Sequence, residues 1–259
     1  MRDHARDLAS GTYARKQLFG GFSLLSWSHR RRFEMARVLA APYRGRALLD
    51  YGCGDGTFLA MVEHEFPGSV GLEVDPDLVR GCADRFGRPG GPQFLLADAA
   101  DALPGRSFAV VVCMEVLEHC PRDAVEVVLA RIQRLVAPDG RVIVSVPVET
   151  GLPLMLKQGA RAIAARRVSN DYRYRERYGV GEFLRMLAGG DKVHVDRPVY
   201  ETTFASGIPN RYHGHKGFNW RAMRRRLAQS FRVVETRFSP VSWLGPQFAS
   251  QAWFVCEPL

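Results

Sequence analysis

Three acidic side chains stand at the ends of three successive short apolar stretches. Asp50 closes the first stretch, Glu73 closes the second, and Asp98 follows the third. If these stretches are parallel strands, their carboxyl ends meet at one edge of a sheet, which is where open α/β folds bind ligands. Carboxylates accept hydrogen bonds from hydroxyl groups and attract cations. The acids therefore predict a site for a positively charged ligand with a ribose diol, with helix caps and turns as the alternative role.

A glycine-rich loop follows the first acid. Gly52, Gly54 and Gly56 are spaced as G-x-G-x-G, and an apolar stretch of helical character, residues 57–66, continues from them. Glycines permit close approach of a ligand, and a helix amino terminus offers free N–H groups. The spacing differs from the G-x-G-x-x-G of dinucleotide-binding loops, and Asp50 would repel a pyrophosphate. We therefore expect a cationic ligand at this loop.

The elements that must position these residues alternate along the centre of the chain. The stretches with the composition of strands are residues 47–50, 69–73, 93–96, 108–113 and 141–146. The stretches with helical character between them are residues 57–66, 76–86 and 121–136. This alternation predicts βαβ units and a parallel sheet with helices on both faces. Two later strands, at 231–238 and 251–257, are expected to extend the edge of the sheet.

Charge changes sign twice along the 259 residues. Residues 1–46 carry a net charge of +7, residues 47–150 carry −8 and residues 151–259 carry +10, which gives the whole chain +9. Arginine supplies 32 of the 36 basic side chains and suits phosphate and carboxylate contacts. An acidic centre suits a cationic ligand, so the basic flanks are the segments expected to meet an anionic acceptor or surface. A biased codon composition would produce the same arginine excess.

Four parts are expected along the chain. They are a basic helical cap at 1–46, a ligand-binding core at 47–150, a basic lid insertion at 151–216, and a helix with the last two strands at 217–259. A hydrophobic fraction of 46% excludes disordered and collagen-like classes. The sequence shows no run of 18 apolar residues, no C-x-x-C pair and no signal peptide. We expect a cytoplasmic protein without a structural zinc site or disulfides.

Five stretches resemble the class I S-adenosylmethionine-dependent methyltransferases. They are LLDYGCGDGTFL (48–59), VGLEVDPDLV (70–79), LLADAADALP (95–104), FAVVVCMEVLEHC (108–120) and LVAPDGRVIVSVP (135–147). Within them, MEVLEH is most similar to the O-methyltransferases of ubiquinone biosynthesis. The resemblance implies a Rossmann-like α/β fold, with a mostly parallel seven-stranded sheet, helices on both faces and an α-helical lid insertion after the fifth strand.

The resemblance also implies the cofactor, S-adenosyl-L-methionine, and the residues that bind it. These cofactor-binding residues are Asp50, Gly52, Cys53, Gly54, Gly56, Glu73, Asp98, Ala99 and Glu115. The glycines would line the methionine part, and Glu73, in a place where aspartate is more common, would hold the ribose. Asp98 and Ala99 would flank the adenine. Asp50 would act through the loop and a water on the methionine amine, while Asp75 is expected to cap the next helix.

The segment from Glu115 to His119 leaves three roles open. His119 can be a general base that takes a hydroxyl proton, with Glu115 on the methyl side of the cofactor. Glu115, Glu118 and His119 can bind a divalent cation, as a similar E-x-x-E-H does in small-RNA 2′-O-methyltransferases. Three histidines are candidates for a further ligand: His194, His213 and His215. Glu118 and His119 can also form a hydrogen-bonded pair that closes the loop.

The activity implied is methyl transfer by in-line displacement, to a hydroxyl of a small-molecule, lipid-linked or glycan acceptor. The cofactor is an activated sulfonium, so positioning and desolvation supply most of the rate, on the order of 7–11 kcal/mol where the geometry is ideal. RNA methylation is one alternative, but no RNA-binding module or N-P-P-Y motif is visible. A non-catalytic partner subunit is the other, and the intact loop and acids count against it.

The basic flanks supply the expected acceptor wall. Its candidate residues are Tyr172, Arg173, Tyr174, Arg175, Arg177, Tyr178, Tyr212, His213 and His215. Two stretches, 19–27 and 152–167, combine apolar with basic residues and are candidates for peripheral contact with an anionic membrane. The alternatives are a solvated surface for the wall and ordinary packing on the sheet for the second stretch.

Overall fold

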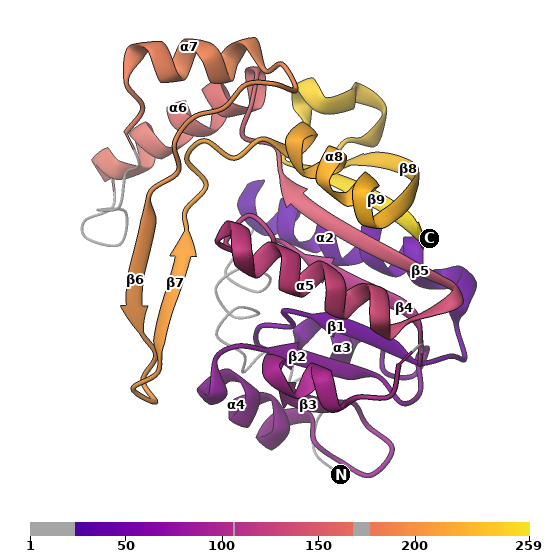
Figure 1. Ribbon diagram of the computed structural model, residues 1–259. Helices are drawn as coiled ribbons and strands as arrows, with labels where there is room; N and C mark the ends of the chain where they lie inside the picture. The colour runs from indigo at the N-terminus through magenta and orange to yellow at the C-terminus, as the bar shows by residue number, and fades with distance from the viewer. Residues whose placement is uncertain (1–23, 106, 168–176) are drawn as a thin grey trace.

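The computed structural model describes residues 24–105, 107–167 and 177–259, and its centre is a seven-stranded sheet (Figure 1). The strands lie in the order β3-β2-β1-β4-β5-β9-β8. Their bounds are β1 Leu48–Tyr51, β2 Val70–Glu73, β3 Gln93–Leu96, β4 Phe108–Met114, β5 Val136–Pro147, β8 Phe231–Ser239 and β9 Gln251–Pro258. The expected sheet, including the two late strands, is confirmed.

Strands β1 to β5 pair in parallel, and β9 runs antiparallel between β5 and β8. From β1 the chain moves outward to β2 and β3, then returns to place β4 on the other side of β1. The order of the strands therefore reverses between β1 and β4. In open α/β sheets, ligands bind outside the carboxyl ends of the strands at such a point.

Helices cover both faces of the sheet because its central strands are apolar throughout. All seven residues of β4 are buried, as expected for a strand that is covered on both sides. One face packs against α5 (Arg122–Leu135) and α8 (Trp220–Ser230). The other packs against α2 (Leu24–Ala40), α3 (Thr57–Val62) and α4 (Pro76–Phe86). The two hydrophobic cores fix the positions of the strand ends.

The start of α4 follows from two residues. Oδ1 of Asp75 accepts a hydrogen bond of 2.9 Å from the amide of Asp77, which satisfies an N–H group that the helix leaves unpaired. Pro76 comes next, where its missing N–H costs nothing. The predicted capping role of Asp75 is confirmed.

The insertion after β5 is more than the α-helical lid that the sequence predicts. It contains α6 (Leu152–Arg167) and α7 (Val180–Ala188), followed by a hairpin of β6 (Val199–Thr203) and β7 (Pro209–His213). The residues of both hairpin strands are exposed or half-buried. They therefore lack the alternation of apolar and polar residues that identifies a strand in a sequence. In Figure 1 the hairpin runs along the side of the molecule toward which β5 points.

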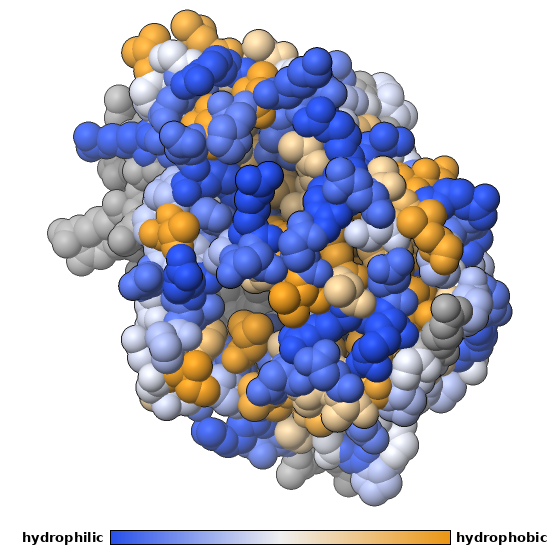
Figure 2. All heavy atoms as spheres, in the orientation of Figure 1, coloured by the Kyte–Doolittle hydropathy of each residue, from blue (hydrophilic) through white to orange (hydrophobic). Residues whose placement is uncertain are grey.

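Three short 3₁₀ helices complete the described elements: η2 (Ala41–Tyr43), η3 (Ala97–Ala102) and η4 (Ser242–Phe248). Figure 2 shows a mainly hydrophilic face on which apolar residues form small groups. Across the described ranges, no helix combines the length and apolar character needed to span a bilayer. Residues 19–23, and Tyr172 to Arg175 of the predicted acceptor wall, lie outside the described residues.

Candidate functional site

The loop after β1 that contains the three glycines has backbone conformations that favour glycine. Gly52, Gly54 and Gly56 have φ angles of +82°, +55° and +74°. A Cβ atom at Gly52 would clash with Cγ2 of Val116, so the loop packs tightly against the segment after β4. A Cβ atom at Gly54 would meet no described atom within 4 Å. The loop is therefore closed against protein at Gly52 and open at Gly54, where a ligand can approach the backbone.

Glu73, at the end of β2, is bonded to this loop. Its Oε2 accepts a hydrogen bond of 2.9 Å from the amide of Gly54, and its Oε1 accepts one of 2.8 Å from the amide of Val74. The amide of Asp75 donates a further hydrogen bond of 3.3 Å to Oε1. Backbone donors thus fix the orientation of the carboxylate, and Oε2 keeps a lone pair for a hydroxyl donor. The first two strand ends lie together as predicted.

Asp50, in β1, is a buried carboxyl group without a described partner. It is 1% exposed, and neither of its oxygens has a hydrogen-bond partner among the described residues. Burial, and then the nearby Glu73 carboxylate, raise the pKa of Asp50 to about 8. A buried polar group without a partner costs free energy, so its presence calls for a ligand or a water that completes the site.

The predicted adenine-side residues follow β3 directly. Asp98 is exposed in the first turn of η3, and Ala99 beside it is half-buried. Cys53 is buried, and its sulfur lies against the backbone of Gly71 in β2. The Cys53 side chain therefore packs the loop against β2, and the role of Cys53 in cofactor binding stays a prediction.

Glu115 follows β4 in a left-handed conformation. Its φ angle of +56° is the one positive φ value at a non-glycine position in the described part of the chain. Its amide donates a hydrogen bond of 3.0 Å to the carbonyl of Ser145, and Oγ of Ser145 donates one of 3.2 Å to Oε1 of Glu115. This conformation costs an L residue about 1–2 kcal/mol, and such strain collects at functional sites. No feature of the sequence signals it.

His119 is joined to the hairpin by two hydrogen bonds. Its Nδ1 donates to the carbonyl of His213 over 2.8 Å, and the amide of His213 donates to the carbonyl of His119, also over 2.8 Å. A carbonyl only accepts, so Nδ1 carries the proton and Nε2 keeps a free lone pair in the neutral ring. Burial lowers the pKa of His119, which favours that neutral ring.

Glu118 is fully buried beside this imidazole. Its Oε1 lies 3.8 Å from Nε2 of His119, which is too long for a hydrogen bond, and neither oxygen has a hydrogen-bond partner within the described ranges. The predicted hydrogen-bonded pair of Glu118 and His119 is therefore wrong. The amide of His119 closes the loop instead, with a bond of 2.9 Å to the carbonyl of Val116. Burial, and then the charge of Glu115, hold the pKa of Glu118 well above its ordinary value.

His215 reaches the same place from the insertion. The centroid of its ring lies 5.1 Å from that of His119, and its Nδ1 lies 3.5 Å from Oε1 of Glu149. The same oxygen forms an ion pair of 2.9 Å with Nζ of Lys157 in α6. Sequence reasoning names His215 but misses Glu149 and Lys157, because their pairing depends on how α6 packs against the end of β5.

The other predicted residues have separate roles. His194 is exposed beside Asp196, and Nδ1 of His213 donates to the carbonyl of Pro198. The hydroxyl of Tyr178 accepts a hydrogen bond from the amide of Gly217, and the ring of Tyr212 packs against Tyr200. Arg177 is exposed, and the contribution of these residues to an acceptor wall stays a prediction.

A surface hollow of about 530 Å³ lies apart from these groups. It is lined by Gly68, Ala83 and residues 87–95, which border the amino end of β3. The acids and the glycine loop lie at the opposite, carboxyl edge of the sheet. The hollow therefore takes no part in the candidate site.

Comparisons with known proteins agree with this arrangement. Residues 26–187 match the model of a methyltransferase domain family. The chain is 36% identical over 106 residues to the ubiquinone biosynthesis O-methyltransferase of Methylococcus capsulatus, a match that spans 39% of this chain and less than half, 43%, of that relative. It is 33% identical over 182 residues to an uncharacterized methyltransferase of Mycobacterium tuberculosis, spanning 63% of this chain and 69% of the relative.

A solved structure supports the fold. The magnesium protoporphyrin IX methyltransferase of Synechocystis PCC 6803, with bound SAH, superposes with a TM-score of 0.55 at 14% identity. The superposition covers 99% of this chain and 94% of the other.

The carboxyl edge of the sheet fits S-adenosyl-L-methionine. The unpartnered Asp50 carboxyl suits a ligand with cationic groups, and the open side of Gly54 leaves space against the backbone. The fixed Glu73 carboxylate suits a ribose diol. With a family match over more than half of its length and the sheet order described above, the chain belongs to the class I S-adenosylmethionine-dependent methyltransferases.

Proposed function

We propose that this methyltransferase acts on a hydroxyl oxygen of a small-molecule, lipid-linked or glycan acceptor, with His119 as the general base. The observation that carries the proposal is the hydrogen bond from Nδ1 of His119 to the carbonyl of His213. It leaves Nε2 able to accept a proton, and a base is needed when the acceptor is a hydroxyl. The name of the Methylococcus relative, an O-methyltransferase, supports the same acceptor atom.

Different residues of the chain serve the cofactor and the acceptor. S-adenosylmethionine, when bound, supplies a methyl group activated by a sulfonium. The glycine loop and Glu73 hold and orient that ligand, and Asp50 suits its amine. On the acceptor side, Nε2 of His119 takes the hydroxyl proton, while the His213 carbonyl keeps the ring in place and stabilises the imidazolium that forms.

Charge in the acceptor-side segments supports an acceptor, or a surface holding it, that is anionic. Residues 151–259 carry a net charge of +10, while the cofactor core at 47–150 carries −8. Arginine predominates and suits phosphate and carboxylate groups. Peripheral contact of the basic flanks with an anionic membrane belongs to the same proposal, because a lipid-linked acceptor lies at such a surface.

A product analysis tests the acceptor atom. The protein is incubated with S-adenosylmethionine carrying an isotopically labelled methyl group and with matched panels of phenols, catechols, sugars, carboxylic acids and a short RNA. Mass spectrometry then locates the label. We expect methyl ethers of hydroxyl compounds, with higher rates for those that carry an apolar chain or a phosphate. Methyl esters alone, or methylated RNA alone, would overturn the proposal.

Substitution of His119 tests the base. His119→Ala should lower kcat by about 100-fold or more, because general-base catalysis contributes at least that much. The cofactor affinity should stay unchanged, and added imidazole should restore turnover in the presence of a chelator. His194→Ala is the control, since His194 is an exposed histidine of the insertion with no bond to His213 or His119 among the contacts of the described residues. Full turnover in His119→Ala would reject the base.

A further inference from the structure

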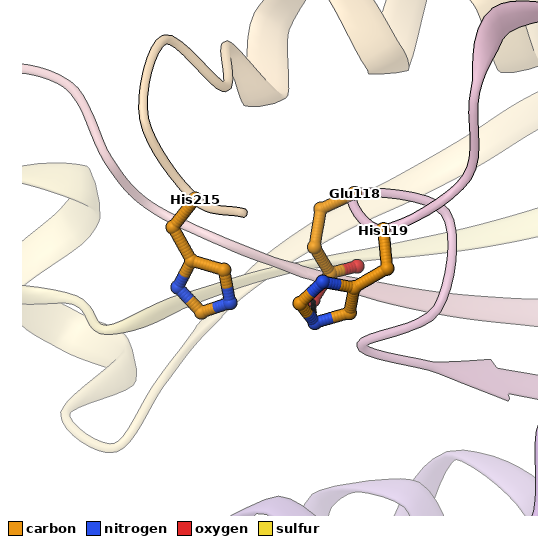
Figure 3. A group of neighbouring side chains, drawn as sticks. All are labelled: Glu118, His119 and His215. Atoms are coloured by element: carbon orange, nitrogen blue, oxygen red, sulfur yellow. Dashed lines mark ion pairs between the residues drawn. The ribbon is translucent and has the colours of Figure 1, made fainter. Parts of the chain in front are cut away.

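Two separate parts of the chain bring three metal-binding side chains together. Glu118 and His119 belong to the loop after β4, and His215 belongs to the segment after β7. One ligand atom of each lies within 4.8 Å of the others. Figure 3 shows the ring of His215 facing the ring of His119, with the carboxylate of Glu118 behind the His119 ring. The site thus joins the cofactor core to the insertion.

The burial of Glu118 is compatible with a role as a metal ligand. Its side chain is 0% exposed, and both of its oxygens lack a hydrogen-bond partner among the described residues. A buried carboxylate is normally paired, hydrogen-bonded or bound to a metal. The guanidinium groups of Arg32 and Arg197 act on it electrostatically, and the imidazole nitrogens of His119 and His215 are the metal-ligand atoms near it.

The outer nitrogen of each ring is already engaged. Nδ1 of His119 donates to the carbonyl of His213, and Nδ1 of His215 lies 3.5 Å from Oε1 of Glu149. Metal-binding histidines are held in this way, with one ring nitrogen on a carbonyl or carboxylate and the other on the metal. The orientation leaves Nε2 of both rings available as ligand atoms.

We propose that Glu118, His119 and His215 bind one divalent transition-metal ion, with zinc as the preferred ion. One carboxylate and two imidazoles form a ligand set used by catalytic zinc sites and by open iron sites, while magnesium prefers oxygen ligands alone. Three protein ligands leave a coordination position open for water or for an acceptor oxygen.

The distances require a modest closure. Ligand atoms about 2.0–2.1 Å from a tetrahedral zinc lie about 3.4 Å from one another. The distance from Oε1 of Glu118 to Nε2 of His119 is 3.8 Å, so this pair is a few tenths of an ångström wider than the bound geometry. The ligand atoms of the three residues lie within 4.8 Å of one another, and we expect rotation of His215 about its side-chain bonds to shorten its distances to the other two.

Access and charge are compatible with binding. The side chains of His119 and His215 are 42% and 32% exposed, so an ion can enter from solvent. Three cations lie near: Arg32, which acts electrostatically on Glu118; Arg197, which donates to the carbonyls of Glu118 and Gly214; and Lys157, which pairs with Glu149. Arg197 and Lys157 thus have acceptors of their own.

The metal site goes beyond the proposed function, but both involve Nε2 of His119. Nε2 of His119 can hold a proton or a metal ion, but not both. With a metal held by these side chains, an acceptor hydroxyl bound to it would be more acidic, and its proton would leave to solvent. His119 is then a ligand, and the methyl acceptor is still an oxygen.

Metal binding is measured without turnover. Untagged protein is stripped with a chelator, dialysed against Zn²⁺, Mn²⁺ or Mg²⁺ alone, and analysed for bound metal; Co²⁺ serves as a spectroscopic probe. We expect one equivalent of Zn²⁺ and a Co²⁺ spectrum with nitrogen ligands. Glu118→Gln and His215→Gln should each weaken Zn²⁺ binding at least about tenfold. His194→Gln, a change at a histidine outside the cluster, should bind as the unaltered protein does.

The outcomes separate the two proposals. Absence of stoichiometric Zn²⁺, or Zn²⁺ binding that persists in both Glu118→Gln and His215→Gln, overturns the metal site and leaves the general base untouched. Circular dichroism of each variant shows that it is folded, and Glu118→Gln preserves the shape of the buried side chain. Turnover that is lost on chelation and restored by Zn²⁺ assigns His119 as a ligand rather than a base.

Discussion

The amide of Gly54 donates a 2.9 Å hydrogen bond to Oε2 of Glu73, and this bond joins the cofactor loop to the end of β2. The two features that sequence reasoning treats separately, a glycine pattern and a strand-end acid, are one unit. The acid is held before any ligand arrives, so less ordering is needed when the cofactor binds.

Glu73→Ala should weaken binding of S-adenosylhomocysteine by about 10- to 100-fold. Hydrogen bonds to a charged group contribute about 1.5–3 kcal/mol, and the variant also releases the Gly54 amide. Isothermal titration calorimetry measures the affinity. Asp75→Ala is the control, because loss of this helix cap should lower stability by about 1 kcal/mol and leave the affinity as it was. Equal affinities in both variants would exclude a role of Glu73 in binding.

Gly54→Ala should bind the cofactor more weakly than Gly90→Ala, a control variant with similar backbone strain. Gly54 and Gly90 both have positive φ angles, +55° and +75°, and a Cβ atom at either meets no described atom within 4 Å. Each substitution should therefore cost about 1 kcal/mol of stability. Only Gly54→Ala places a methyl group where the ligand is expected. If calorimetry finds the same affinity in both variants, the open side of Gly54 is not the ligand's side.

Asp50→Asn should stabilise the protein without cofactor, and more so at high pH. The pKa of Asp50 is 3.8 in its ordinary state and about 8 in the fold. A group with a raised pKa contributes stability that is complete below about pH 4 and is lost as the pH rises to 8. Chemical denaturation at pH 5, 7 and 9 should show a growing advantage for Asn, with weaker cofactor binding. A difference that is constant with pH would contradict the buried, unpartnered carboxyl.

Glu115→Gly should be more stable than Glu115→Ala. Both variants lose the contact with the hydroxyl of Ser145, but only glycine adopts the φ angle of +56° without strain. The difference in free energy of unfolding should be about 1 kcal/mol in favour of glycine. Parallel urea titrations measure it, and an advantage for alanine would show that the strain is absent.

Local signals made the core predictable. The strand at 108–113 is apolar at every position and is buried as β4, and Gln93–Leu96 has the bounds of β3 as the structure has them. Acids at strand ends could be placed because parallel strands end at one edge. The hairpin Val199–His213 could not be predicted from the sequence, because its residues alternate in neither polarity nor burial.

The surroundings of His119 show where prediction from sequence ends. The E-x-x-E-H pattern indicated chemistry, but the partners of its histidine come from residues about 95 positions later, as in the bond from Nδ1 to the His213 carbonyl. Long-range contacts of this kind depend on how the insertion docks. Neither the missing bond between Glu118 and His119 nor the approach of His215 has a signature in the spacing of residues.

The two hydrogen bonds between His119 and His213 couple the orientation of the His119 imidazole to the position of the hairpin. A change in β7 that tilts the chain at His213 turns the ring of His119, although the glycine loop and Glu73 stay as they are. If His119 acts on the acceptor as proposed, mutations in the insertion alone would change acceptor choice, because the glycine loop is bonded to β2 and not to the hairpin.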